Sequence, residues 1–307
     1  MLHPTSSLVE RAYSDAPQTS QGIDFLHGAN SSAELSHRCA LMQALVLRAV
    51  SHHIRVYMNM SSEPSLAPLI SVVVPVHNEA ENLHGLINAI NSALASYPYE
   101  IIYVDDGSTD STPMVLAQIA STVPTLKWVR HKKSCGQSGA VVTGVKKARG
   151  QYVATLDGDG QNDPADIPAM LEAMTAAEAK GPCPVLIAGH RVHRQDTNAK
   201  RYGSRLANKV RAWALKDNTP DTGCGLKLFR CEAFLELPHF DHIHRFLPAL
   251  FIRAGGQVVS VPVRHHARAH GASHYNNWQR LKVGLVDLAG VAWLQRRWNV
   301  PQIETHE

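Results

Sequence analysis

A regular alternation of short apolar runs and amphipathic segments, beginning at Leu69, is the feature that most constrains the fold of this chain. The apolar runs are rich in β-branched residues, and the segments between them repeat their apolar residues at helical spacing. The expected strands cover 70–74, 100–104, 127–130, 152–156 and 185–188, and the expected helices cover 79–96, 111–120, 137–148 and 165–178. Apolar, β-branched runs that alternate with amphipathic helices predict an α/β fold, with a mostly parallel sheet and helices on both faces.

Polar residues gather directly after three of the expected strands. The clusters are Pro75–Glu79, Asp105–Ser108 and Asp157–Asp159. Ligands of parallel sheets bind at the carboxyl ends of the strands, so these clusters predict one common binding site. The first cluster lacks the glycines of the dinucleotide-binding fingerprint, and a dehydrogenase is therefore not expected.

The third cluster contains two carboxylates, Asp157 and Asp159, each followed by a glycine. Alternate residues of an extended chain point the same way, so both carboxylates are expected to face one hard cation. Oxygen ligands of this kind suit Mg²⁺ or Mn²⁺ held against a diphosphate. A calcium loop of the EF-hand type is excluded, because Asn162 and Pro168 stand where that loop requires Gly and Glu. A surface turn without a ligand remains an alternative.

Composition limits the class of protein and its surroundings. The 307 residues suffice for one large α/β domain with appendages, and a formal net charge of +4 argues against a general nucleic-acid binder. Five cysteines without a spacing pattern fit a reducing compartment. Residues 1–32 do not resemble a signal peptide, and no apolar run reaches the length of a membrane span. We therefore expect a cytoplasmic protein that is soluble or peripheral on the cytoplasmic face of a membrane.

Three regions are expected along the chain. Residues 1–66 form an N-terminal extension, which begins with a composition typical of disorder and continues with helical periodicity. Met58 and Met60 precede the first core strand, so the extension is either an over-extended reading frame or a genuine helix. Residues 67–275 form the main domain, and residues 276–307 form an amphipathic helical segment. That segment carries Trp and Arg side chains and fits a helix in the membrane interface, with docking on the main domain as the alternative.

Four ordered motifs carry a resemblance to a known family. They are SVVVPVHNEAENL, EIIYVDDGSTDST, GQSGAVVTGVKKARGQYVATLDGDGQNDP and DTGCGLKLFR. Together they resemble the family 2 glycosyltransferases, in the branch typified by dolichol-phosphate mannose synthase and bacterial polyprenyl-phosphate sugar transferases. The GT-A fold of this family implies a nucleotide-binding, mostly parallel sheet whose acceptor-side half is mixed. The resemblance covers Leu69 to about Trp298. It implies a nucleotide-sugar donor, a divalent cation, a lipid-phosphate acceptor and inversion at the anomeric centre.

The resemblance also implies roles for individual residues. The donor nucleotide is expected to contact residues that follow the first two strands, namely Pro75, His77, Glu79, Asp105 and Asp106. The metal and the diphosphate are expected at Asp157, Asp159 and Gln161, and Asp159 is counted among the catalytic residues. His77 stands where the family often has Tyr. The helix that begins at Gln137 could offer backbone N–H groups to a phosphate, or could simply pack on the sheet.

The acceptor decides whether a catalytic base is needed. A lipid phosphate is already an anion at neutral pH, whereas a sugar hydroxyl has to lose its proton to a carboxylate. Asp221 stands where related transferases place that carboxylate, and it is expected here to position the acceptor or, as second choice, to act as the base. The groups expected to bind a lipid phosphate are Arg191, Arg194, Arg201, Arg268, Ser273 and His274. His274 replaces the Lys that is usual in the family.

Two other functions remain open: a different transferase activity and a binding function without catalysis. One is a transferase to a sugar hydroxyl in polysaccharide or glycolipid assembly, with Asp221 as the base. The other is a catalytically silent nucleotide-sugar-binding protein, against which the intact acidic motifs argue. The expected partners are the nucleotide-sugar donor, the lipid-phosphate acceptor, a membrane surface and, because many relatives carry membrane spans, a membrane-anchoring protein.

Three neighbouring histidines allow two interpretations. His244 begins the sequence His-Arg-Phe, which matches an acceptor-loop motif of the family. The spacing of His239, His242 and His244 would also suit a zinc ion. We favour the acceptor loop.

Overall fold

The computed structural model of the protein describes residues 67–192, 211–267 and 277–297. They belong to one compact unit, Glu63–Glu307. The predicted extension 1–66 and the last residues, 298–307, lie outside the described part. So do several of the predicted acceptor residues, namely Arg194, Arg201, Arg268, Ser273 and His274.

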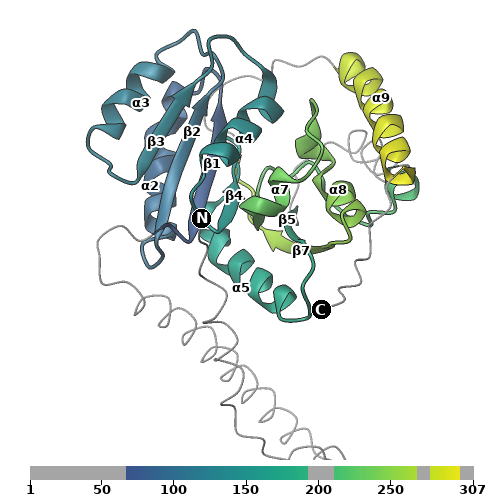
Figure 1. The fold of residues 1–307 in the computed structure, drawn as a ribbon. Coiled ribbons are helices and arrows are strands. Elements are labelled where there is room, and N and C mark those ends of the chain that lie inside the picture. Colours follow the sequence, from purple (N-terminus) through teal and green to yellow (C-terminus); the bar gives the residue numbers. More distant parts are fainter. Residues whose placement is uncertain (1–66, 193–210, 268–276, 298–307) are drawn as a thin grey trace, which may run out of the picture. The chain divides into compact units, whose positions relative to one another are not determined.

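One seven-stranded sheet lies at the centre of the described fold (Figure 1). Its strands are β1 (Ile70–Val76), β2 (Tyr99–Asp105), β3 (Leu126–Arg130), β4 (Tyr152–Thr155), β5 (Val185–Arg191), β6 (Lys227–Arg230) and β7 (Gln257–Val263). The order is β3-β2-β1-β4-β6-β5-β7, and β6 alone runs antiparallel to its neighbours, β4 and β5. The predicted mostly parallel sheet with a mixed acceptor-side half is confirmed, and all five predicted strands are present.

Helices cover both faces of this sheet. The α-helices are α2 (Leu83–Ala93), α3 (Thr112–Ala120), α4 (Gly136–Lys147), α5 (Ile167–Glu178), α7 (Cys231–Leu235), α8 (Leu247–Arg253) and α9 (Asn277–Arg296). Short 3₁₀ helices precede three of them: η2 (Ala80–Asn82), η3 (Pro164–Asp166) and η4 (Ile243–Arg245). The core on one face contains residues of α2, α3 and α5, and the core on the other contains residues of α4, α7 and α8.

The two cores explain the run of valines in β1. Val72 and Val74 belong to the core with α2 and α5, whereas Val73 between them belongs to the core with α4. All three are fully buried. Strand side chains alternate between the faces, so a strand that is covered on both faces is mostly apolar. Its one polar side chain, Ser71, is buried and donates to Glu100 Oε1 at 2.7 Å.

The C-terminal helix α9 is docked on α8 along one side. Gln295 Nε2 donates to the carbonyls of Ala249 (3.1 Å) and Leu215 (3.0 Å), and Val291 is buried. The opposite side exposes apolar residues, including Val286 at 72% and Trp293 at 60% exposure. The predicted helix is therefore docked and also presents an apolar surface. None of the described helices is long and apolar enough to cross a membrane.

Candidate active site

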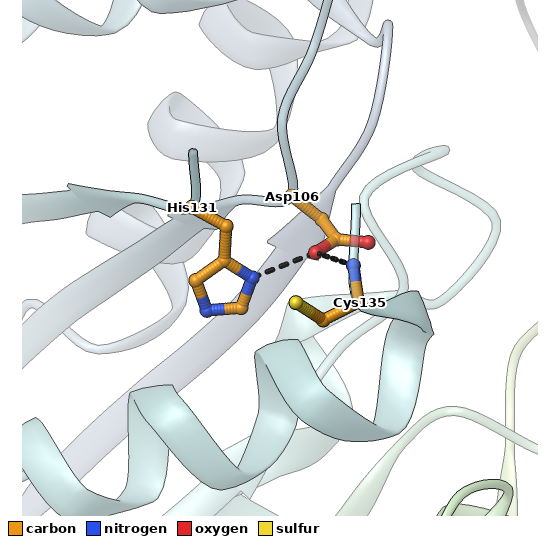
Figure 2. A group of neighbouring side chains, drawn as sticks. All are labelled: Asp106, His131 and Cys135. Carbon is orange, nitrogen blue, oxygen red and sulfur yellow. Dashed lines mark hydrogen bonds and ion pairs between the residues drawn. The ribbon is translucent and has the colours of Figure 1, made fainter. Parts of the chain in front are cut away.

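Asp106 follows β2 and fixes the loop between β3 and α4 (Figure 2). Its carboxylate accepts hydrogen bonds from His131 Nδ1 (2.7 Å), Ser134 Oγ (2.6 Å) and the backbone N–H groups of Cys135 (2.8 Å) and Gly136 (2.9 Å). Burial alone would raise the pKa of Asp106, but the four donors together lower it, so the group is ionised at neutral pH. Both oxygens have protein donors, and the predicted contact with a nucleotide base would be an additional one.

The start of α4 binds two of the acidic residues of the site. The N–H groups of Cys135 and Gly136 donate to Asp106, so they are directed at a protein carboxylate. The next side chain, Gln137, donates from Nε2 to Asp157 Oδ1 at 2.7 Å. The start of α4 therefore connects the end of β2 with the acidic turn that follows β4.

The other predicted nucleotide-binding residues differ in accessibility. Asp105 is fully buried and pairs with Arg130, with 3.0 Å between Oδ2 and Nε. Pro75 and Glu79 are half-buried, and His77 is exposed while its Nδ1 donates to the Asp106 carbonyl at 2.9 Å. Pro75, His77 and Glu79 are therefore partly accessible to a ligand, whereas Asp105 is not. The Asp105 carboxylate instead accepts the Ser108 N–H at 2.8 Å.

Asp157 and Asp159 lie in a turn that follows β4. β4 ends at Thr155, and Gly158 and Asp159 form the turn. The assumption of an extended strand end is therefore wrong for this segment, because the chain bends between the two carboxylates. The two groups are still coupled: burial and, next, the charge of Asp159 raise the pKa of Asp157.

Asp157 is held in place by several parts of the chain. Its backbone N–H donates to Asn162 Oδ1 at 3.2 Å, and its carboxylate accepts the bond from Gln137. The same carboxylate rests directly on Gly225, where an added Cβ would lie 2.2 Å from Asp157 Oδ2. The Gly225 carbonyl is fixed in turn by Thr155 Oγ1, which donates to it at 2.7 Å. Gly225 precedes β6, and sequence reasoning missed its role.

These residues fit a divalent cation. A cation relieves the repulsion between two coupled carboxylates, one of which has a raised pKa, and carboxylate oxygens are the ligands of Mg²⁺ and Mn²⁺. Gln161 donates from its backbone N–H to Asp159 Oδ1 (3.1 Å) and from its side chain to the His266 carbonyl (3.4 Å). Asp157 and Asp159 could therefore hold a metal directly, with Gln161 orienting Asp159.

Asp221 and Arg191 form a bidentate ion pair at the end of β5. Arg191 Nε and Nη2 donate to the two carboxylate oxygens of Asp221 at 2.7 Å and 2.8 Å, and Asp221 is buried. The guanidinium that sequence reasoning assigned to an acceptor phosphate is thus bound to a protein carboxylate. A bidentate guanidinium stabilises the anionic carboxylate and makes Asp221 a weak base.

Lys227, which sequence reasoning missed, is the first residue of β6 and is only 3% exposed. Its Nζ donates to the backbone carbonyls of Cys224 and, at 3.4 Å, of Thr222. Burial lowers the pKa of Lys227, while the charges of Asp157 and Asp221 act in the opposite direction. The ammonium therefore lies within the electrostatic reach of both carboxylates.

The half-buried ring of His244 contacts the helix that begins beside the acidic turn. A 2.7 Å hydrogen bond joins its Nδ1 to Ser138 Oγ on α4. Burial and the nearby charge of Lys227 hold the pKa of His244 well below its usual range, so the ring is neutral. This contact links η4, in the second half of the chain, to the helix that also fixes Asp157.

The three histidines near residue 240 do not converge. His239 Nε2 donates to the Phe234 carbonyl (3.3 Å), and His242 pairs with Asp287 of α9 (3.0 Å). Within the described residues, the one group of three or more ligand-type side chains close enough to share a metal is Asp106, His131 and Cys135 (Figure 2). The zinc interpretation of the three histidines therefore has no structural support.

The acidic turn also adjoins the start of the predicted acceptor segment. His266 donates from its backbone N–H to the Gln161 carbonyl at 2.9 Å, and Asn162 forms an antiparallel bridge with His265. A cavity of about 310 Å³ lies beside the turn; its lining includes Asn82, Leu86, Asp159, Asp163, Pro164 and His266. The chain therefore runs along the proposed metal residues directly before Arg268.

Solved structures share this fold. A mannosyltransferase from Pyrobaculum calidifontis, in complex with GDP-Man and Mn²⁺, has a TM-score of 0.55 and 22% identity, with 84% of this chain and 77% of that chain covered. Glucosyl-3-phosphoglycerate synthase from Mycobacterium tuberculosis, in complex with Mn²⁺, UDP-Glc and phosphoglyceric acid, has a TM-score of 0.53 and 20% identity, with 74% and 79% covered. At these identities the likeness establishes the GT-A fold.

Curated relatives are closer in sequence. Dodecaprenyl-phosphate galacturonate synthase of Rhizobium johnstonii is 33% identical over 77% of this chain and 70% of its own length. Undecaprenyl-phosphate 4-deoxy-4-formamido-L-arabinose transferase of Edwardsiella ictaluri is 32% identical over 67% of this chain, and the match spans 62% of the relative's length. Residues 71–237 match the family described as Glycosyl transferase family 2. The carboxylate turn, the sheet order and these matches agree, and the chain belongs to the family 2 glycosyltransferases.

Proposed function

We propose that this protein transfers a sugar from a nucleotide-diphosphate sugar to a polyprenyl phosphate, with a divalent cation and with inversion at the anomeric carbon. The proposal rests mainly on one observation: the acidic turn, which would bind the donor, lies near the Asp221–Arg191 pair, which would lie beside the acceptor. The acidic turn follows β4, the Asp221–Arg191 pair lies at the end of β5, and the intervening strand β6 carries Lys227. The names of the two curated relatives support a polyprenyl-phosphate acceptor.

The donor would lie across the ends of β1, β2 and β4. His77 and Glu79 are accessible to the nucleoside, while Asp106 keeps the β3–α4 loop in shape beside it. Asp157 and Asp159 would hold Mg²⁺ or Mn²⁺, which supplies Lewis-acid stabilisation of the leaving diphosphate. Gln137 and Gly225 keep the Asp157 carboxylate in a fixed place, so little reorganisation is needed when the donor binds.

The pairing of Asp221 favours a phosphate acceptor. Its carboxylate is stabilised as an anion by Arg191, which weakens it as a base for a sugar hydroxyl. A lipid phosphate needs no base, since it is ionised at neutral pH. Arg268, which follows the described His266 by two residues, is the proposed phosphate contact, with Ser273 and His274 further along the chain.

The exposed side of α9 would meet the membrane that contains the lipid acceptor. Val283, Val286 and Trp293 recur along one exposed stripe, and Arg297 lies over the Trp293 ring at 5.8 Å. Trp213, 82% exposed, belongs to the segment that contacts α9 through Leu215. Apolar and aromatic residues with flanking arginines are typical of helices in the membrane interface. We propose a peripheral attachment on the cytoplasmic face, with or without an anchoring protein.

The acceptor assignment is tested with two lipids that differ in one group. The purified chain is incubated with Mn²⁺, labelled nucleotide-sugars and either polyprenyl phosphate or the corresponding polyprenol, and the lipid phase is counted. We expect label in the lipid phase when polyprenyl phosphate is the acceptor and none when polyprenol replaces it. Transfer to the polyprenol, or to a soluble sugar hydroxyl and not to the phosphate, would support the alternative with Asp221 as the base.

A further inference from the structure

We propose that Arg264 is a positioning residue of the metal site: it fastens the segment that follows β7 (264–266) to the acidic turn, and so keeps the two metal carboxylates in place. The inference rests on the proposed function and adds to it a residue, about a hundred positions further along the chain, on which metal binding depends. Arg264 would act through the turn and not by contact with the metal.

The acidic turn needs support from outside its own sequence. β4 ends at Thr155, before the first carboxylate residue, and the turn contains Gly158 and Gly160. Gly160 has a φ of +71°, a left-handed conformation that glycine adopts without strain. The turn adjoins the cavity of about 310 Å³, and nothing lies within 4 Å of a Cβ added to Gly160. Because the glycines allow several conformations and one side of the turn is open, contacts with other segments have to select the conformation that is seen.

The segment 264–266 makes such contacts through its backbone. The His266 N–H donates to the Gln161 carbonyl at 2.9 Å, and Gln161 Nε2 donates to the His266 carbonyl at 3.4 Å. The neighbouring residues, Asn162 and His265, form an antiparallel bridge. β7 is the last strand of the sheet, whereas β4 lies in its middle, so this pairing joins the turn to a distant part of the fold.

The two turn residues that pair with this segment also contact the metal carboxylate residues. Asn162 Oδ1 accepts the backbone N–H of Asp157 at 3.2 Å, and the backbone N–H of Gln161 donates to Asp159 Oδ1 at 3.1 Å. A displacement of the segment would therefore be transmitted to both Asp157 and Asp159.

Arg264 fixes the segment to η3, the 3₁₀ helix that follows the turn. Its backbone N–H donates to Asp166 Oδ2 at 2.7 Å, and its Nε donates to Asp166 Oδ1 at 2.9 Å. Its Nη1 lies 3.2 Å from Asp163 Oδ2, and His266 Nε2 lies at the same distance from that oxygen. One guanidinium thus bridges two carboxylates, which requires the planar arrangement of donors that arginine has and lysine lacks. The Arg264 side chain is 56% exposed, so we expect an effect of moderate size.

Binding of Mn²⁺ separates the position of the turn from the charge of Arg264. Arg264→Gln removes a positive charge, which by electrostatics alone would strengthen the binding of a cation nearby. If Arg264 acts by holding the turn, the variant should instead bind Mn²⁺ about three- to tenfold more weakly. The affinity is measured on the full chain with UDP or GDP present, from the electron paramagnetic resonance signal of the free ion, and thermal unfolding confirms that the variant is folded.

Two further variants complete the test. Arg264→Lys keeps the charge and loses the bridge, so it should also bind Mn²⁺ more weakly than the wild type; it decides the question if Arg264→Gln does not fold. Arg149→Gln is the matched control: the Arg149 side chain is 58% exposed and pairs with Glu100, but it precedes β4, at the end opposite to the turn, and should bind Mn²⁺ like the wild type.

The outcomes distinguish the inference from the proposed function. Unchanged or tighter Mn²⁺ binding in folded Arg264→Gln, wild-type binding in Arg264→Lys, or an equal loss in Arg149→Gln would overturn the positioning role and leave the proposed transferase intact. If the wild type binds no Mn²⁺ with either nucleotide, the metal assignment in the proposed function is contradicted, and the inference with it.

Discussion

Substitution of Gly225 by Ala should displace the Asp157 carboxylate while leaving the fold in place. An added Cβ would lie 2.2 Å from Oδ2, 2.3 Å from Cγ and 2.4 Å from Oδ1 of Asp157, whereas ordinary contacts begin near 3.4 Å. The carboxylate would have to move by about 1 Å. Misplacement of a catalytic group by that distance costs roughly 100-fold in rate, or about 2.7 kcal/mol of transition-state stabilisation.

The assay for Gly225→Ala is kcat/KM for the donor as a function of Mn²⁺ concentration, together with thermal unfolding. We expect kcat/KM to fall by about 100-fold, the Mn²⁺ concentration for half-maximal activity to rise, and the free energy of unfolding to fall by no more than about 1–3 kcal/mol. Gly290→Ala is the matched control, because nothing lies within 4 Å of its added Cβ on α9. Wild-type turnover and metal dependence in Gly225→Ala would refute the contact between Gly225 and a catalytically required Asp157.

Further predictions concern the acidic residues and the N-terminal extension. Asp106→Asn should weaken nucleotide binding measured by calorimetry and destabilise the β3–α4 loop. Because the folded-state pKa of Asp106 is lowered, its ionised form stabilises the protein above a pH of about 4, and this stability is lost as the pH falls through the lowered pKa. Acid unfolding followed by circular dichroism should therefore be less steep in Asp106→Asn, and an unchanged profile would contradict the four-donor arrangement. Asp221→Asn should lower stability by roughly 3–5 kcal/mol in denaturant titrations, because it leaves Arg191 unpaired in a buried place, and should reduce transfer to a lipid phosphate only modestly. Complete loss of turnover in a folded Asp221→Asn protein would favour a hydroxyl acceptor. Deletion of residues 1–57 should give a folded, active enzyme, and an insoluble product would show that the extension is structural.

The sheet was accessible to sequence reasoning because its signal is local. The strand in 70–74 is apolar except for Ser71, and β1 (Ile70–Val76) is buried on both faces, so its run of apolar β-branched residues identifies it. The polar clusters after β1, β2 and β4 lie at the carboxyl edge of the sheet, as predicted. Their position follows from the strands, because parallel strands end at the same edge. The turn at Gly158 was not predicted, because two glycines permit several backbone conformations and the sequence does not select among them.

The partners of the site residues depend on contacts between distant parts of the chain. Asp106 was expected to face a ligand, but its donors come from 25 to 30 residues further along the chain. Lys227 was missed because it is a single charge within the apolar sequence LKLF, where it resembles a solvent-exposed strand position. Its burial follows from the antiparallel pairing of β6 with β4 and β5, which no local pattern specifies. Gly225, two residues before Lys227, was a sequence signal of a close approach.

We propose that Asp157 and Asp159 hold a metal that is required for sugar transfer to a lipid phosphate. The most direct test of this proposal is the incorporation of label from a nucleotide-sugar into polyprenyl phosphate by the wild type with Mn²⁺, the wild type with chelator, and Asp157→Asn with Mn²⁺. We expect lipid-linked label in the first sample and a loss of several orders of magnitude in the other two, with Mn²⁺ restoring the chelated wild type. Full transfer in chelator, or by a folded Asp157→Asn protein, would contradict it.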